Sequence, residues 1–195
     1  MILSNTEIHR AIDEGDFIVD PEPLPRTGTI DEPESPYDTS SVNLRLASAL
    51  SIADTKHALS IDLRQGGVAA LLTKIYSKKE IDPAGGFSLD PHSFVLGKTI
   101  ERIGLPIRPG RPNLAARVEG RSSFARCGVL VHFTAPTIHA GFEGTITLEI
   151  LNLGKHPVML YPNMRICQLI LERVEGVPNA QPSQFHGQTT PAGTR

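Results

Sequence analysis

Chain-breaking residues divide this sequence into short segments: 17 glycines and 16 prolines are spread over 195 residues. The segments between them are rich in valine, isoleucine and leucine, which favour strands over long helices. The pattern predicts a mainly β protein with many short strands joined by turns, as in a sandwich or a jelly-roll barrel. The expected strands are 41–46, 94–98, 114–118, 129–133, 144–153, 157–160 and 164–172.

One early helix interrupts this β pattern. Ser4 and Glu7 have the spacing of a capping box, and Gly15 is placed to end the helix. The apolar side chains that share one helical face are Ile8, Ala11 and Ile12. We therefore expect a helix that packs on a sheet, followed by a proline-rich and acidic surface excursion over residues 20–40.

The size and charge of the chain limit its functional classes. The length predicts one domain over residues 1–195, and no run approaches the ~20 apolar residues of a membrane helix. The N-terminal segment lacks the pattern of a secretory signal, so we expect a cytoplasmic protein that does not bind membranes. A formal net charge of -2 gives no global field for a nucleic acid polymer, so an anionic ligand needs a local cluster. The thiols of Cys127 and Cys167 lie in apolar stretches and are expected to be buried.

The last segment, residues 177–195, lacks apolar periodicity and is rich in Gly, Pro, Gln and Thr. Such a segment is mobile by itself. Two interpretations remain open. The segment is either a frayed tail or a flap that closes over a ligand, with Phe185 as a stacking ring and Gln188 as a polar contact.

The segment Arg121-Ser122-Ser123-Phe124-Ala125-Arg126 places two hydroxyls between two guanidinium groups. Ser122 or Ser123 is expected to cap a short helix that ends near Gly128, so that backbone N–H groups and hydroxyls converge. With Arg121 and Arg126 beside them, these donors suit a phosphate chain. A capped surface helix with solvated arginines is the alternative. A serine nucleophile is disfavoured, because the pattern is not Gly-x-Ser-x-Gly and no carboxylate–histidine partner follows from the spacing.

Residues 144–153 alternate between two faces, as a strand does. One face carries Ile146, Leu148 and Ile150, and the other carries Thr145, Thr147 and Glu149. Glu149 is then either a solvated carboxylate or, if its face lines a pocket or a subunit interface, a group able to shuttle protons. His139 lies in a turn without the neighbours or the spacing of a zinc site.

Four segments, taken together, resemble the dCTP deaminase family within the trimeric dUTPase-like superfamily. They are EGRSSFARCGVLVHFTA, GFEGTITLEILN, PVMLYPNMRICQLI and FVLGKTIERIGLP, and the N-terminal segment also fits. The resemblance covers most of residues 1–172. It implies a distorted jelly-roll or β-barrel subunit of the dUTPase-like type with a few short helices, and a homotrimer with active sites between neighbours.

The resemblance also implies an activity, the hydrolytic deamination of dCTP to dUTP and ammonia, with dTTP as a possible inhibitor. Magnesium enters only with the triphosphate, and no zinc is expected, because the sequence lacks the H-x-E and P-C-x-x-C pattern of zinc deaminases. Glu149 would then carry the protons, and Arg126 would stabilise charge and hold Glu149. The implied catalytic groups are Glu149, Arg126, Ser122 and the backbone carbonyl of Ala135. The implied nucleotide contacts are Arg121, Ser122, Ser123, Arg126, Thr134, Phe142, Phe185 and Gln188.

The sequence departs from the family pattern at several positions. His139 and Asn43 stand where the family has aspartate, and Gln184 and Phe185 stand where lysine and tyrosine are common. Asn163 replaces a turn glycine, a mild change because asparagine tolerates positive φ. His139 argues against the two alternatives with phosphate chemistry, a dUTP diphosphatase and a bifunctional deaminase. The altered positions leave a third alternative, a nucleotide-binding trimer with weak catalysis, and also a modified pyrimidine as substrate.

Overall fold

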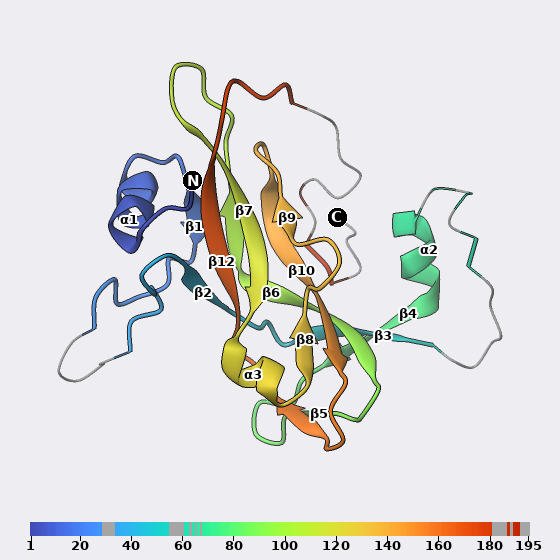
Figure 1. Ribbon diagram of the computed structural model, residues 1–195. Helices are drawn as coiled ribbons and strands as arrows, with labels where there is room; N and C mark the ends of the chain where they lie inside the picture. The colour runs from blue at the N-terminus through green and yellow to red at the C-terminus, as the bar shows by residue number, and fades with distance from the viewer. Residues whose placement is uncertain are drawn as a thin grey trace.

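The computed structural model describes residues 1–28, 34–54, 61–62, 64, 66, 68–180, 187 and 189–191. Strands dominate the structure, which confirms the mainly β prediction (Figure 1). The helices are α1 (Asn5–Asp13), α2 (Val68–Ile75) and α3 (Ser122–Arg126). The strands are β1 (Ile18–Asp20), β2 (Val42–Arg45), β3 (Ala49–Ala53), β4 (Tyr76–Glu80), β5 (Phe87–Leu89), β6 (Phe94–Gly104), β7 (Asn113–Gly120), β8 (Val129–Val131), β9 (Thr137–Ile138), β10 (Glu143–Asn152), β11 (Val158–Leu160) and β12 (Arg165–Val174).

Two larger sheets contain most of the strands. One has the order β4-β3-β6-β10-β8, with β1 also paired to β6, and the other has the order β2-β12-β7-β9. A separate pair joins β11 to β5. Buried aliphatic side chains from both larger sheets form one core cluster, which includes Leu44, Val118, Leu148, Ile150 and Leu169. In the described residues the strands thus form separate packed sheets rather than one closed barrel.

The seven strands expected from the sequence are all present, with ends that differ by a few residues. β10 shows the predicted alternation most clearly, because its residues from Gly144 to Asn152 alternate between buried and half-buried positions. The turn before β12 contains Asn163 at φ +66°, so asparagine accepts the left-handed conformation expected there.

The N-terminal helix forms as predicted, but only half of its capping box does. Ser4 Oγ accepts a hydrogen bond from Glu7 N at 3.4 Å, and the helix buries Ile8 and Ala11. The Glu7 carboxylate binds Arg10 and Arg173 instead of returning to the backbone of Ser4. The helix is therefore attached to β12 by an ion pair as well as by its apolar face.

Two predictions about individual side chains are wrong. Tyr37 lies in the excursion expected at the surface, yet it joins the core cluster with 6% exposure, because its ring packs edge-on against His9 at 4.5 Å. Cys127 is exposed, because it is the residue that ends α3, whereas Cys167 on β12 is buried as expected. Burial raises the pKa of the Cys167 thiol far above its usual range.

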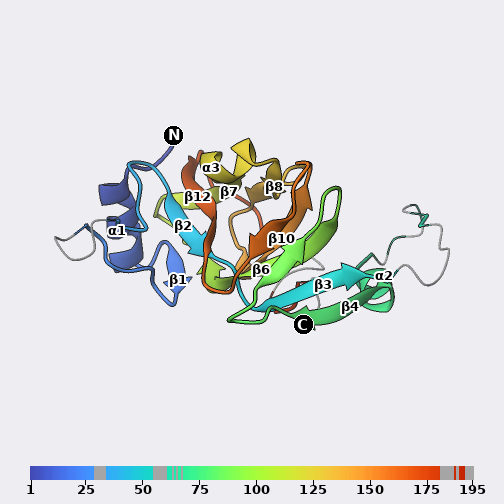
Figure 2. The same cartoon turned by 90° about the horizontal axis from the view of Figure 1, so that it is seen from below.

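A hairpin of β3 and β4, extended by α2, projects from the body of the molecule (Figure 2). No residue of α2 is buried, although its sequence VAALLTKI is largely apolar. None of the helices within the described residues is both long and apolar enough to cross a bilayer.

Candidate functional site

Glu149 lies on the face of β10 that points away from the core. Ile146, Leu148 and Ile150 on the opposite face are at most 1% exposed, whereas Glu149 is half-buried. In the ladder between β10 and β6, Glu149 pairs with Leu96, which is only 6% exposed. The carboxylate therefore stands on a partly covered surface and not on an open one.

Other groups surround Glu149 on this surface. Thr147, two residues before it, has a buried Oγ1 without a hydrogen-bond partner within the described chain, and Lys98 lies directly opposite Thr147 on β6. Burial and, secondarily, the negative charge of Glu149 raise the pKa of the Tyr76 phenol, so Tyr76 at the start of β4 is also near the carboxylate. These side chains give the surface both polar and aromatic contacts.

The described part of the C-terminal tail reaches the two strands that carry these residues. Gly187 N donates to the carbonyl oxygen of Glu143 on β10 at 2.9 Å, and Lys98 Nζ donates to that of Thr189 at 2.7 Å. Phe185, Gln188 and Gln184 lie outside the described residues. The tail therefore meets the Glu149 side of the sheet.

The helix that follows the Arg-Ser-Ser sequence begins differently from the prediction. Ser122 is its first residue, and the extended residue before it is Arg121, whose carbonyl oxygen accepts from Phe124 N and Ala125 N at 3.0 Å each. The prediction that a serine caps this helix is wrong, because the chain is still extended at Arg121, directly after β7. Both hydroxyls instead lie on the first turn of the helix.

The end of α3 agrees with the prediction. Gly128 has φ +85°, and its N–H donates to Ala125 O at 3.0 Å. A Cβ atom at Gly128 would lie 2.5 Å from Gly154 N, so the backbones of the two glycines touch. This contact fixes α3 against the end of β10.

We predict that Gly128→Ala destabilises the protein by about 1–3 kcal/mol, because alanine resists positive φ and its methyl group meets backbone that cannot move aside. Urea unfolding of the two proteins measures the difference. Gly110→Ala is the matched control: Gly110 has φ +75° but nothing within 4 Å of the added atom. An equal loss in both variants would mean that the contact with Gly154 is unimportant.

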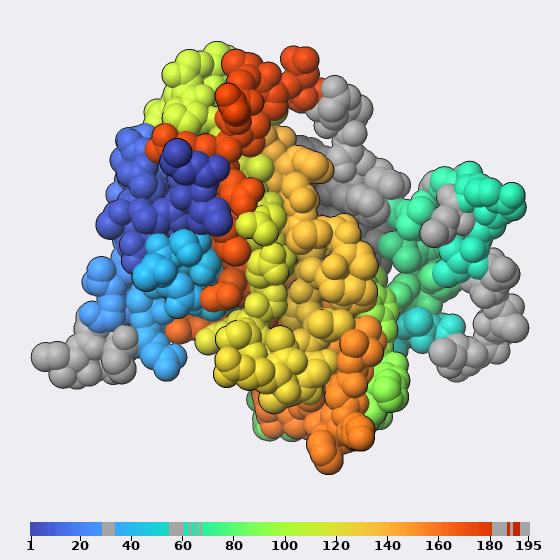
Figure 3. Space-filling view, viewed as in Figure 1, coloured from blue at the N-terminus to red at the C-terminus, as the bar shows by residue number. Residues whose placement is uncertain are grey.

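The predicted phosphate-binding side chains are open to solvent. Ser122, Ser123 and Arg126 are exposed on α3, which is part of the yellow surface in Figure 3. Arg121 is half-buried, since its guanidinium lies 5.7 Å from the centre of the Phe124 ring and donates to Arg165 O at 3.4 Å. The turn can therefore offer hydroxyls and guanidinium groups to an anion that approaches from outside.

A short antiparallel ladder connects this turn to Glu149. β8 follows α3 and pairs with β10, and His132, the next residue, donates its backbone N–H to Glu149 O at 2.9 Å. His132 has φ +58°, and its ring Nε2 lies 2.7 Å from Ala135 O. Because a carbonyl oxygen only accepts, Nε2 is the donor, and Nδ1 is buried without a partner in the described residues. His132 thus joins the Ala135 carbonyl to the Glu149 strand, a role that no local sequence pattern indicates.

The structure shows no hydrogen bond or ion pair between Glu149 and the remaining predicted site residues that it describes. Thr134 and His139 are exposed, and Phe142 is half-buried against the core cluster. Among the ion pairs within the described residues, none joins Arg126 to Glu149. The structure also contains no group of three or more His, Cys, Asp or Glu side chains suited to a metal ion in its described part.

The fold is mainly β, and the pairing of β8 with β10 connects the Arg-Ser-Ser turn to the strand that carries the half-buried Glu149. These features indicate a class of β proteins that bind an anionic ligand beside a strand carboxylate. The chain is a member of the dCTP deaminase-like family, whose model matches residues 2–174.

Relatives share this similarity over nearly their whole length. The chain is 37% identical to a dCTP deaminase, dUMP-forming, of Dictyoglomus thermophilum. The alignment has 201 positions and covers 100% of this chain and 94% of that protein. The chain is also 37% identical to a protein of the same name from Methanothermobacter thermautotrophicus, over 100% of this chain and 93% of that protein. The identity to a dCTP deaminase of Natronomonas pharaonis is 34%, over 100% of this chain and 94% of that protein.

The fold resembles a solved structure as well. The 2'-deoxycytidine 5'-triphosphate deaminase of Agrobacterium tumefaciens superposes with a TM-score of 0.61 at 18% identity, over 89% of this chain and 47% of that one. The present chain therefore spans about half the length of that solved protein, and the two share a fold.

Proposed function

We propose that this protein hydrolyses the 4-amino group of dCTP and releases ammonia. The observation that carries the proposal is the position of Glu149, which is half-buried and joined through His132 to the Ala135 carbonyl. The names of the relatives, 34–37% identical over the whole chain, support dCTP as the substrate. The nucleotide enters as its magnesium complex, so the ion is part of the substrate.

The proposed chemistry consists of proton transfers by Glu149. The carboxylate takes a proton from water as the water oxygen attacks C4, and it delivers a proton to N3. Glu149 then takes the proton of the new C4 hydroxyl and passes it to the 4-amino group as the C4–N bond breaks and the C4 carbonyl forms, so that dCTP and water give dUTP and ammonia. The Ala135 carbonyl orients the water, and Arg126 stabilises charge at the reacting centre.

We also propose that the active site is completed between the subunits of a homotrimer. Arg126 and Glu149 do not pair within one chain, yet both belong to the proposed site. Two large apolar side chains that follow β8 and β10 are exposed and would be covered by a neighbour, Phe133 at 44% and Leu153 at 54%. A second subunit can therefore place its own α3 near Glu149, and dCTP would bind in the crevice between them.

The product is a separate question from the deamination. His139 replaces the aspartate that supports attack of water on the α-phosphate in dUTPases, so we propose dUTP as the released nucleotide. The second candidate product is dUMP, because relatives from Dictyoglomus and Methanothermobacter are named dUMP-forming. Release of pyrophosphate distinguishes the two.

The test is an assay of the purified protein with magnesium and, in turn, dCTP, dUTP and CTP, in which nucleotides, ammonia and pyrophosphate are all measured. The proposal expects ammonia from dCTP in equal amount to a uracil nucleotide. Pyrophosphate from dCTP would identify the second candidate. Tight binding of dCTP or dTTP without any product would reject the enzyme in favour of a nucleotide-binding trimer.

We predict that His132→Phe lowers kcat for dCTP by about 10-fold or more, because a displaced group in an active site costs up to about 10²-fold. Phenylalanine keeps the ring but cannot donate to the Ala135 carbonyl. Steady-state kinetics measure the effect, and KM for dCTP should change less than kcat. His156→Phe is the control, since His156 is exposed between β10 and β11. If the two variants have the same kcat, the contact between His132 and Ala135 does not position the water.

A further inference from the structure

A cavity of about 650 Å³ is lined by residues that follow β1 and by residues of β2 and β12, which are neighbours in one sheet. Arg45 and Asn43 from β2 and Arg165 from β12 line it, and the acidic residues Glu22 and Glu34 also line it. Pro21, Pro23 and Leu24 form its apolar side. Small-molecule sites in proteins have volumes of about 300–1,000 Å³ and this mixture of apolar walls with a few polar groups.

The two arginines are an unusual pair. Arg165 lies directly opposite Arg45 in the antiparallel ladder between β12 and β2. Like charges at directly opposed positions destabilise a sheet, because their side chains share one face at short distance. The pair is therefore not explained by the stability of the sheet alone.

Partners within the protein neutralise this charge only in part. Arg45 Nε donates to Glu101 at 2.7 Å, and Glu101 is completely buried. Arg165 donates mainly to backbone, to the carbonyl oxygens of Glu34 at 2.9 Å and Ser35 at 3.4 Å. The nearest carboxylate oxygen to Arg165 belongs to Glu34 at 3.7 Å, on a side chain that is 85% exposed. One of the two opposed charges thus lacks a close carboxylate.

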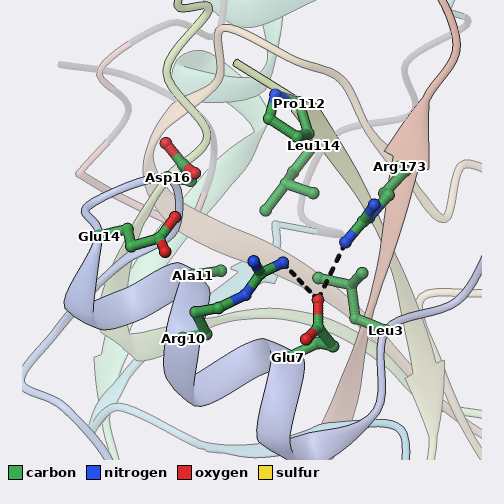
Figure 4. A pocket seen from close by; sticks show the side chains of 9 residues that line it. All are labelled: Leu3, Glu7, Arg10, Ala11, Glu14, Asp16, Pro112, Leu114 and Arg173. Carbon is green, nitrogen blue, oxygen red and sulfur yellow. Dashed lines mark hydrogen bonds and ion pairs between the residues drawn. The ribbon is translucent and has the colours of Figure 1, made fainter.

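A second cavity contains two arginines, one on α1 and one on β12, whose role is structural. It measures about 70 Å³ and lies between α1 and β12 (Figure 4). Arg10 and Arg173 converge there on the carboxylate of Glu7, at 2.5 and 2.9 Å. These charges have close carboxylate partners, whereas the nearest carboxylate oxygen to Arg165 in the described residues is 3.7 Å away.

Asn43 adds a requirement for a hydrogen-bond donor. Its side-chain amide donates to Pro36 O at 2.9 Å and to Asp38 Oδ2 at 3.0 Å, which fixes the orientation of the group. The other amide atom, Oδ1, is buried without a hydrogen-bond partner in the described residues, and the whole residue is 3% exposed. A buried acceptor is stabilised when it receives a donor.

We propose that this cavity binds a phosphate-bearing small molecule of nucleotide size. The phosphate lies between the guanidinium groups of Arg45 and Arg165, which match its oxygens in geometry and charge. A hydroxyl of the ligand donates to Asn43 Oδ1, and its carbon skeleton lies against the prolines and Leu24. The site does not depend on the deamination proposed above, although it adjoins the Arg-Ser-Ser turn through the hydrogen bond from Arg121 to Arg165 O.

The test is titration calorimetry with inorganic pyrophosphate, which requires no turnover. Arg165→Gln should weaken the binding of pyrophosphate at least 10-fold, and its melting temperature shows that the variant is folded at the temperature of the titration. Arg173→Gln is the matched control on the same strand and should bind within twofold of the wild type. If Arg165→Gln also binds within twofold of the wild type, the proposal is wrong.

Two further measurements identify the source of the phosphate. If Arg126→Gln on α3 also weakens pyrophosphate binding and Arg165→Gln raises KM for dCTP at unchanged kcat, the cavity holds the triphosphate of the substrate. If Arg126→Gln binds pyrophosphate normally and Arg165→Gln leaves KM for dCTP unchanged, the ligand is a separate phosphorylated molecule. Both results support a phosphate site. Absence of dCTP turnover in the wild type would reject the proposed function without affecting the calorimetric result.

Discussion

Replacing Glu149 by glutamine is expected to lower the rate of dCTP deamination by about 10²–10⁴-fold, the usual contribution of a positioned general acid and base. Glutamine preserves the size of the side chain and its place on β10 but cannot take the proton from water or return one to the nucleotide. Release of ammonia measures the rate, and calorimetry with dCTP measures binding, which should persist.

The control for this experiment is on the same strand. Glu143→Gln changes a carboxylate at the start of β10 that is exposed and paired with Arg102. We expect this variant to keep at least half of the wild-type rate. A rate for Glu149→Gln equal to that of the Glu143 variant would remove Glu149 from the mechanism.

The second large effect is on stability. Arg45→Met is expected to destabilise the protein by about 3–5 kcal/mol, the usual cost of leaving a buried charge without its partner. The charge is that of Glu101, which is completely buried and accepts from Arg45 Nε at 2.7 Å and from Arg45 N at 2.9 Å. Unfolding in guanidinium chloride measures the loss.

The double variant Arg45→Met with Glu101→Met tests the cause of this loss. Apolar side chains of similar volume often replace a buried ion pair without loss of stability. We therefore expect the double variant to recover more than half of the free energy of unfolding lost in the single variant. No recovery would show that the packing of the arginine stem matters, and not the unpaired charge.

Alternation of apolar residues explains how far the fold was predictable from the sequence. β10 alternates in sequence and in burial alike, because one of its faces covers the core. β4, with the sequence YSKKE, was missed, because it is an edge strand with four exposed residues and no apolar face to signal it. α2 was missed for the opposite reason, since its apolar residues are not buried by the rest of the described chain.

The candidate site was predictable where it depends on the alternation of residues along a strand and on the residue types in a segment. The face of Glu149 followed from the alternation of its strand, and the polar character of the turn at Ser122, Ser123 and Arg126 followed from the residue types. The contact of His132 with the Ala135 carbonyl requires a positive φ at a histidine, which no local pattern announces. The opposed Arg45 and Arg165 depend on the register of two strands far apart in sequence, which a single sequence does not reveal.

In the proposed homotrimer, Glu149 of one chain acts together with the Arg-Ser-Ser turn of a neighbour. Complementation tests it directly: Glu149→Gln and Arg126→Gln proteins are unfolded together, refolded as a mixture, and assayed for release of ammonia from dCTP. With random assembly into trimers, about a quarter of the sites would combine an intact Arg126 with an intact Glu149, so we expect about a quarter of the wild-type rate. A mixture no more active than the two variants refolded separately would contradict an active site shared between chains.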